Sequence, residues 1–263
     1  MSMKTVTSLR RGLQVLRLIN ETGGCQIKTL QANVDLPKPT IIRMVATLVE
    51  AGYVWRSEAG IYKVSAKVLS LANRYDADEG LLMAARPVLA KLRSEMAWPS
   101  DLAAFDGDAM VILDTGEDPG TFGLNRARGS RLPVLTTSLG RAYLAFREPR
   151  TQEELLSHLL KVEAPRSHAK LTMSRLKRIL KETKEQGYSA ADGEYLKNTR
   201  AVAVPILVKG RPLATINLMT VISAMEMAEV ERNFVAPLLA AARQISETLS
   251  ESAPGEGLAA AAL

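Results

Sequence analysis

Residues 36–52, with the sequence LPKPTIIRMVATLVEAG, carry two kinds of side chain at helical spacing. At about 100° per residue, an apolar set falls on one side of the predicted helix and a basic, hydroxyl-bearing set falls on the other. The apolar set is Ile41, Ile42, Val45, Leu48 and Val49, and the other set is Lys38, Thr40, Arg43, Met44 and Thr47. A helix with two such sides is typical of proteins that read the major groove of DNA.

The second set offers particular contacts to a DNA duplex. Arg43 can present two donors to one guanine, which is the commonest base-specific contact. Met44 can meet a thymine methyl group, and packing in the core is an equally good interpretation. The hydroxyls of Thr40 and Thr47 suit phosphates better than bases. The candidate DNA contacts are Lys38, Thr40, Arg43, Met44 and Thr47, with Arg10 and Arg56 either as phosphate contacts or as ordinary solvated charges.

The neighbouring segments predict a winged helix-turn-helix around this helix. The expected elements are a helix over residues 9–21 capped by Ser8, a short helix over 27–33, the helix of 36–52 and a hairpin that pairs 53–56 with 61–64. The apolar stripe of the first helix would consist of Leu9, Leu13, Leu16 and Ile19. Pro37 and Pro39 open the helix of 36–52, where a missing N–H costs nothing.

The positive charge of the chain is concentrated in its first third. The net charge of the 263 residues is +6, but residues 1–75 hold 11 lysines and arginines against 4 acids, and the rest hold 23 against 24. This segregation is the electrostatic pattern of a protein with one nucleic-acid-binding end. It weakens the alternative that the excess charge only solvates the chain. We therefore expect double-stranded operator DNA as a partner of residues 1–75.

After an acidic stretch at residues 76–80, the pattern changes to strands alternating with helices. The predicted domains are a DNA-binding domain at 1–75, a linker and helix at 76–96, an effector-binding domain at 97–251 and a disordered tail at 252–263. Strands are expected over 101–105, 109–114, 121–125, 188–191, 201–208 and 213–221, and helices over 81–96, 139–147, 152–161, 173–186 and 225–251. Pro87 predicts a kink or a late start in the helix of 81–96. Antiparallel strands flanked by helices make this part α+β.

The strand predicted over residues 213–221 places an amide among apolar neighbours. Alternation puts Asn217 on one face with Leu213, Thr215, Met219 and Val221. A buried amide needs hydrogen-bond partners, which either a ligand or a neighbouring strand could supply. A helix that starts near Leu139 offers its N-terminus to a carboxylate. The candidate effector-binding residues are Leu102, Ala104, Leu124, Thr136, Thr137, Ser138, Ala201, Asn217 and Met219. Arg126 and Arg131 could neutralise an acid, although a surface role is the better interpretation of both.

Segments spread over most of the chain resemble a known family. They are SLRRGLQVLRLI at 8–19, LPKPTIIRMVATLVEAGYV at 36–54, IYKVSAKVLSLA at 61–72, RLPVLTTSLGRAYLAF at 131–146, EQGYSAADGEY at 185–195 and RAVAVPILVKGRPLATINL at 200–218. Their order and spacing resemble bacterial transcription factors of the isocitrate-lyase-regulator (IclR) type. The resemblance implies a winged helix-turn-helix joined to a GAF-like effector domain with an antiparallel sheet, and operator binding as a homodimer or tetramer. The segment WPSDLAAFDGDAMVIL at 98–113 is similar to regulators of hydroxyphenylpropionate and related aromatic-acid catabolism.

The chain also departs from the pattern of this family. Members that bind small keto acids often carry hydroxyls at the positions of Asn217 and Met219, a cysteine at Ala201 and an acid at Ala191. Here the site is larger or more apolar at three of these positions. The departure favours a bulkier, aromatic acid over an acid of two or three carbons. Glu194 fits the family pattern, either as a residue that orients a loop or as one that meets the ligand.

Other functional classes fit the sequence less well. Ser138 lies in TTSLG rather than in a GxSxG elbow, and no glycine-rich phosphate loop occurs. An enzyme acting on a small organic acid is therefore the weaker alternative, and we assign no catalytic residue. A non-specific architectural DNA-binding protein is a second alternative, but it leaves the near-neutral second domain without a purpose.

The amino-acid composition indicates which cofactors the chain can hold and which cellular compartment it suits. A single cysteine, Cys25, cannot form an internal disulfide and fits a reducing cytoplasm. With only His158 and His168 beside it, almost no ligands are available for zinc, and we expect no metal and no cofactor. No uninterrupted apolar run approaches the roughly 20 residues that a membrane helix needs.

Overall fold

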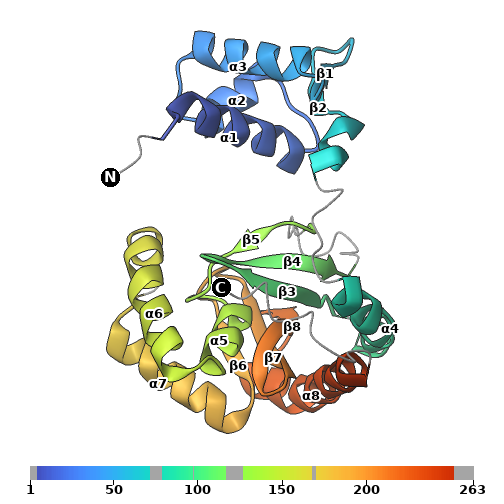
Figure 1. Cartoon of the computed structure of the whole chain (residues 1–263), viewed down its shortest axis with the longest axis vertical. Helices are drawn as coiled ribbons and strands as arrows, with labels where there is room; N and C mark the ends of the chain where they lie inside the picture. The colour runs from blue at the N-terminus through green and yellow to red at the C-terminus, as the bar shows by residue number, and fades with distance from the viewer. Residues whose placement is uncertain (1–4, 72–78, 97, 117–126, 168–169, 252–263) are drawn as a thin grey trace. The chain divides into compact units, whose positions relative to one another are not determined.

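The computed structural model describes residues 5–71, 79–96, 98–116, 127–167 and 170–251. The chain divides into two compact units, Met1–Asp76 and Ala77–Leu263 (Figure 1). The first is a helical unit with a small hairpin, and the second is a mixed unit built on one antiparallel sheet. The α+β fold class predicted from the sequence is confirmed.

The first unit has the order of a winged helix-turn-helix. Its elements are α1 (Thr7–Glu21), α2 (Ile27–Asn33), α3 (Lys38–Glu50), β1 (Val54–Arg56), β2 (Tyr62–Val64) and the 3₁₀ turn η1 (Ala66–Leu71). Its buried core comprises Val15, Ile19, Cys25, Leu30, Val34, Ile41, Val45 and Val54. Two backbone hydrogen bonds between Cys25 and Tyr62, of 3.0 and 2.9 Å, join the turn after α1 to the hairpin. The core thus holds α3 against α1 and α2, with its other side free.

Helix α1 differs from its prediction. It begins at Thr7, after Val6, and Ser8 makes no capping hydrogen bond. Leu9 and Leu13 are 63% and 56% exposed, so their predicted place in the buried stripe is wrong. At 100° per residue they lie about 120° and 160° away from Val15, whose side faces α3.

The second unit contains a six-stranded antiparallel sheet in the order β5-β4-β3-β8-β7-β6. The strands are β3 (Asp101–Asp106), β4 (Ala109–Thr115), β5 (Arg131–Leu132), β6 (Ser189–Asp192), β7 (Thr199–Val208) and β8 (Arg211–Val221). The helices are α4 (Glu79–Met96), α5 (Ser138–Ala145), α6 (Pro149–Glu163), the 3₁₀ turn η2 (Ala164–Arg166), α7 (Met173–Gln186) and α8 (Met227–Glu251). Helix α4 runs through Pro87 and starts earlier than predicted, so the late start is wrong.

Helices cover both faces of this sheet (Figure 1). Helices α4 and α8 pack on one face, where Ile216 and Leu218 belong to their core cluster. Helices α5, α6 and α7 pack on the other face, where Ala103 and Ala203 belong to a second cluster. Because successive strand residues alternate between faces, the odd-numbered residues of β8 around 217 point toward α5.

Some predicted elements cannot be compared with the structure. The strand of 121–125, the tail of 252–263 and His168 lie outside the described residues. Strand β5 was not predicted, because two residues are too short to show an alternating pattern. None of the described helices has the length and hydropathy needed to cross a membrane.

Candidate functional site

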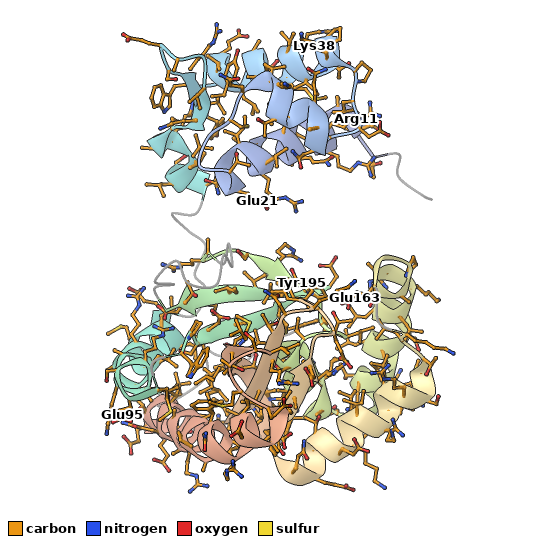
Figure 2. The ribbon with its side chains drawn as sticks, turned by 180° about the vertical axis from the view of Figure 1, so that it is seen from behind. Arg11, Glu21, Lys38, Glu95, Glu163 and Tyr195 are labelled. Carbon is orange, nitrogen blue, oxygen red and sulfur yellow. The ribbon has the colours of Figure 1, made fainter. Side chains whose placement is uncertain are left out.

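Helix α3 presents an exposed face that differs in part from the predicted one. Lys38, Arg43 and Thr47 are exposed, and Figure 2 shows Lys38 on this helix. Ile42 and Val49, which the prediction placed on the apolar side, are 45% and 39% exposed. Both lie about 80–100° from the fully buried Ile41, at the edge of the apolar side.

Two of the predicted DNA contacts have other partners. Met44 is half-buried and packs against the core of the first unit, which favours the core interpretation. The exposed Thr47 hydroxyl donates to the backbone oxygen of Arg43 at 2.9 Å. Thr40 is half-buried near the start of α3. Within the described helix, Arg43 therefore remains the strongest base-reading candidate.

Two further predicted DNA contacts lie outside α3. Arg10 is exposed on α1, and Arg56 is exposed on the hairpin, where its guanidinium lies 5.6 Å from the centre of the Tyr62 ring. Ile42 and Ala46 share the exposed side with Arg43, and sequence reasoning missed both. Centring the helical wheel on Ile41 and Val45 alone would have identified them.

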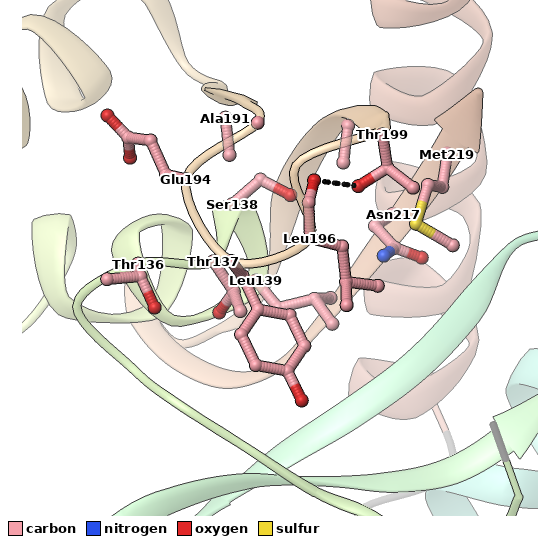
Figure 3. Close-up of a pocket in the computed structure, with 13 residues that line it drawn as sticks. Thr136, Thr137, Ser138, Leu139, Ala191, Glu194, Leu196, Thr199, Asn217 and Met219 are labelled. Carbon is pink, nitrogen blue, oxygen red and sulfur yellow. Dashed lines mark hydrogen bonds between the residues drawn. The ribbon is translucent and has the colours of Figure 1, made fainter. Parts of the chain in front are cut away.

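A small cavity lies between strands β7 and β8 and the start of α5 (Figure 3). Its volume is about 30 Å³, and it is lined by Thr136, Thr137, Ser138, Leu139, Ala191, Gly193, Glu194, Tyr195, Leu196, Thr199, Ala201, Asn217 and Met219. Six predicted effector residues thus come together: Thr136, Thr137, Ser138, Ala201, Asn217 and Met219. In this conformation the cavity has room for water but not for an organic acid.

Two predicted effector residues lie away from this cavity. Leu102 and Ala104 pack on the sheet face covered by α4 and α8, so their predicted place in the cavity wall is wrong. The reason is strand register: Leu102 pairs with Ile216, and paired residues point to the same face. Leu124 and Arg126 lie outside the described residues.

Some of the polar groups that line the cavity form hydrogen bonds with other groups of the protein. The Asn217 side-chain oxygen accepts from the Asp101 N–H at 2.8 Å, which is the strand partner expected as one interpretation. The Thr137 hydroxyl donates to the Pro133 oxygen at 2.6 Å and accepts from the Gly140 N–H at 3.2 Å, so it caps α5. The Ser138 hydroxyl and the Asn217 amide nitrogen point toward the middle of the cavity (Figure 3). These two groups could meet a ligand.

A buried cluster of charges lies against the cavity. The carboxylate of Glu194 forms ion pairs with Arg141 and Arg175, the latter at 2.7 Å. The Arg141 side chain is 3% exposed, and its Nε donates to the Leu135 oxygen at 2.8 Å. Burial lowers the pKa of Arg141, while the charge of Glu194 opposes that effect. Sequence reasoning missed Arg141, whose position in the apolar segment SLGRAYLA was the available signal.

A larger cavity adjoins the small one. Its volume is about 380 Å³, and Thr136, Glu194 and Tyr195 line both. Its other lining residues are Asp108, Ala109, Arg131, Leu132, Pro133, Val162, Glu163 and Ser167. Figure 2 shows Glu163 and Tyr195 close together. Cavities of this size hold small organic ligands.

Glu163 and Arg131 have defined roles in this larger cavity. The Glu163 carboxylate accepts from the backbone N–H groups of Val134 and Leu135 at 2.8 and 3.0 Å, and burial raises its pKa. It therefore holds the segment that leads into α5. Arg131 forms ion pairs with Asp106 and Asp108, as expected of a surface residue.

Arg200 anchors the turn that carries Glu194. Its guanidinium pairs with Asp192 at 3.1 Å and with Glu226 at 3.2 Å. It also donates to the backbone oxygens of Ile222 and Met225, at 3.2 and 2.6 Å. One buried side chain thereby links the end of β6 to the segment before α8.

Among the described residues, those that line the two cavities include no histidine and no cysteine. Across the described residues, no three His, Cys, Asp or Glu side chains gather as ligands for a metal ion.

Both parts of the chain match known protein families. Residues 8–58 match the IclR helix-turn-helix domain, and residues 75–247 match the bacterial transcriptional regulator IclR C-terminal domain. The Pca regulon regulatory protein of Pseudomonas putida is 28% identical over 247 residues, covering 93% of this chain and 84% of that protein. The transcriptional repressor IclR of Escherichia coli is 27% identical over 249 residues, covering 92% and 89%.

Solved structures share the fold over nearly the full length. An IclR family transcriptional regulator from Brucella abortus is 27% identical with a TM-score of 0.66, covering 94% of each chain. An IclR homologue from Microbacterium hydrocarbonoxydans, complexed with 4-hydroxybenzoate, is 23% identical with a TM-score of 0.68, covering 94% of this chain and 100% of that one. The relatives are transcriptional regulators, not enzymes. With both of its domains matched in order, the chain belongs to the IclR family of bacterial transcriptional regulators.

Proposed function

We propose that this regulator binds operator DNA through α3 and that a small organic acid, of the aromatic class, modulates that binding from the cavity beside α5. The observation that carries the proposal is the cavity itself. The Ser138 hydroxyl and the Asn217 amide face inward among apolar walls that include Leu139, Leu196 and Met219. A few polar groups among apolar walls are typical of small-molecule sites.

Two features favour a ring-containing acid over a very small one. Ala191 and Ala201 leave space where a side chain with a polar group would fill it, and Tyr195 offers a ring for stacking. The adjoining cavity of about 380 Å³ gives a larger ligand a place to extend. The family resemblance to regulators of aromatic-acid catabolism points the same way, and a catabolic operon is the proposed target.

The DNA side of the proposal depends on Arg43. We expect Arg43→Ala to weaken operator binding by about 1–3 kcal/mol while sparing binding to random DNA, because a lost bidentate base contact affects only the specific complex. Arg17→Ala is the matched control, since Arg17 is an exposed arginine on α1 paired with Glu21 at 3.3 Å. Gel shifts at a fixed salt concentration measure the affinity of both variants for operator DNA and for random DNA. Equal weakening on operator and random DNA would show that Arg43 contacts only phosphates.

The ligand side is tested with 4-hydroxybenzoate, the acid in the related solved structure. Binding to the native state should raise the melting temperature of the full chain, by an amount that grows with the logarithm of the ligand concentration above its dissociation constant. It should also change the affinity for the operator, since a ligand shifts an equilibrium only by its differential affinity for the two states. A panel of aromatic acids without effect on either quantity contradicts the proposed effector class.

The remaining parts of the proposal concern assembly and location. We propose a homodimer or tetramer, supported by the exposed apolar Leu9 and Leu13 on α1 and by the two-fold sites that helix-turn-helix proteins read. A cytoplasmic location fits DNA as the partner. A non-specific architectural protein would show no operator preference in the same gel shifts.

A further inference from the structure

Glu194 stands between the cavities and two arginines. It lines both cavities, and its carboxylate pairs with Arg141 and with Arg175. The other donors of Arg141 go to the backbone oxygens of Leu135 and Ala190. Among the described residues, Glu194 is the acid that forms an ion pair with Arg141. The buried charge of Arg141 is thus balanced by a side chain that also faces the ligand site.

A ligand carboxylate has the same shape and charge as the carboxylate of Glu194. Guanidinium groups bind such planar, two-oxygen anions with paired hydrogen bonds. A buried arginine left without an anion is strongly unfavourable. An acid that replaces Glu194 would therefore keep Arg141 paired with an anion. A neutral ligand would leave Arg141 without a partner anion.

The sizes of the cavities also require a rearrangement. The small cavity holds about 30 Å³, too little for an organic acid. Glu194 lies on its boundary with the cavity of about 380 Å³. Arg141 and Arg175 line neither cavity, so a ligand in either cavity meets them only if the Glu194 side chain moves away. The turn that carries it starts at Gly193, with φ of +64°.

We propose that Arg141 and Arg175 are the carboxylate anchor for the acid effector, and that Glu194 occupies this anchor until the effector displaces it. This inference rests on the proposed function, because it needs an acid in this cavity. Glu194 is then an internal competitor that sets the threshold concentration of the effector. It also restricts the site to anions, since only an anion replaces its charge.

The test measures melting temperatures of the full chain with benzoate and 4-hydroxybenzoate. Glu194→Gln keeps the side-chain shape and removes the charge, so the variant should melt lower than the wild type. Added acid should restore its stability, with a half-saturating concentration at least tenfold lower than that of the wild type. 4-Hydroxybenzamide, which has the same ring but no charge, should show no such difference.

Asp114→Asn is the matched control. Asp114 also lies between two arginines, with Arg93 at 2.7 Å and Arg86 at 3.9 Å, and it lines neither cavity. Its loss removes the same kind of charge without opening a ligand site. Acid should not restore the stability of this variant. Equal restoration of both variants would overturn the proposal.

A second variant covers the case in which Glu194→Gln does not fold. Arg175 is 38% exposed, so Arg175→Gln should be tolerated. It leaves one guanidinium in the anchor and should weaken acid binding severalfold, whereas unchanged binding would contradict the proposal.

The outcomes separate this inference from the proposed function. If acids bind the wild type and alter operator binding, but Glu194→Gln binds them no tighter, the displacement is wrong and the effector site stands. If Glu194→Gln gains acid binding and operator binding does not respond, the anchor stands and regulation by acid is wrong.

Discussion

At the scale of single residues, position on a helix separates DNA contact from packing. Ile42 and Met44 are both apolar and lie two positions apart on α3. Ile42 is 45% exposed beside Arg43, whereas Met44 packs into the core of the first unit. Residues two apart on a helix point about 160° apart, so a substitution at Ile42 tests DNA recognition and one at Met44 tests stability.

We expect Met44→Ala to lower the free energy of unfolding by about 1–2 kcal/mol, which is less than the roughly 2–5 kcal/mol of a fully buried methionine because Met44 is only half-buried. Ile42→Ala should change stability by less than about 0.5 kcal/mol. It should nevertheless reduce the preference for the operator severalfold, through loss of apolar contact with thymine methyl groups. Urea unfolding and salt-matched gel shifts measure the two effects. If Ile42→Ala lowered stability and Met44→Ala reduced operator preference instead, the exposed face described for α3 would be wrong.

The buried carboxyl group of Glu163 predicts how the free energy of unfolding depends on pH. Burial raises the pKa of its carboxyl above the ordinary value of 4.5, so the folded chain holds this proton more tightly than the unfolded chain. Its contribution to the free energy of unfolding is therefore fully present below about pH 4.5 and is lost as pH rises through the raised pKa. Glu163→Gln does not titrate. The stability of the wild type minus that of the variant should fall between pH 4 and pH 7, as measured by urea unfolding. A difference that grows with pH would show that the backbone N–H groups outweigh burial.

At the scale of elements, the start of α5 is fixed by close backbone packing. A Cβ added at Gly140 would lie 2.1 Å from the backbone oxygen of Val134. The segment before α5 is itself held by the Glu163 carboxylate. Neither backbone can move away without disturbing the cavity that lies beside both.

We expect Gly140→Ala to lower the free energy of unfolding by about 1–3 kcal/mol, as overpacking does. It should also weaken binding of the acid effector, because Ser138 and Leu139 move with the helix. Gly12→Ala is the control, since nothing lies within 4 Å of a Cβ at that helical position. It should instead stabilise the chain by about 0.5–1 kcal/mol. Thermal unfolding with and without 4-hydroxybenzoate distinguishes the two, and a neutral Gly140→Ala would show that α5 can shift freely.

The elements with local signals could be predicted from the sequence. Helix α7 has its predicted bounds, because Thr172 caps its start and Gly187, with φ of +86°, ends it. Local signals could not predict which side of α1 is buried or on which face of the sheet Leu102 lies. Both faces of the sheet are covered by helices, so an apolar residue is buried on either face and its type does not say which. The ion pair between Arg141 and Glu194 joins α5 to a turn more than fifty positions away, and no local sequence pattern shows it.

At the scale of the whole molecule, two units with different charge share one chain. The first third holds the basic excess and the helix-turn-helix, and the second unit holds the cavities. Operators read by helix-turn-helix dimers have two half-sites. The exposed Leu9 and Leu13 on α1 are the surface that we propose for pairing in the first unit.

We expect the double variant Leu9→Ser, Leu13→Ser to bind the operator more weakly and less cooperatively, because it removes exposed apolar area from α1. Sedimentation of the DNA complexes should show a lower ratio of protein to operator. The control is Leu71→Ser, which changes another exposed leucine of the same unit. Unchanged stoichiometry in the double variant would place the pairing surface elsewhere.

The contacts of Arg200 have a consequence for signalling. The same guanidinium binds Asp192, at the start of the turn that carries Glu194, and the carbonyls just before α8. Helix α8 packs in turn along α4. We therefore expect a displacement of this turn to be accompanied by a tilt of α8, so that the longest of the described helices would respond to a ligand in the cavity.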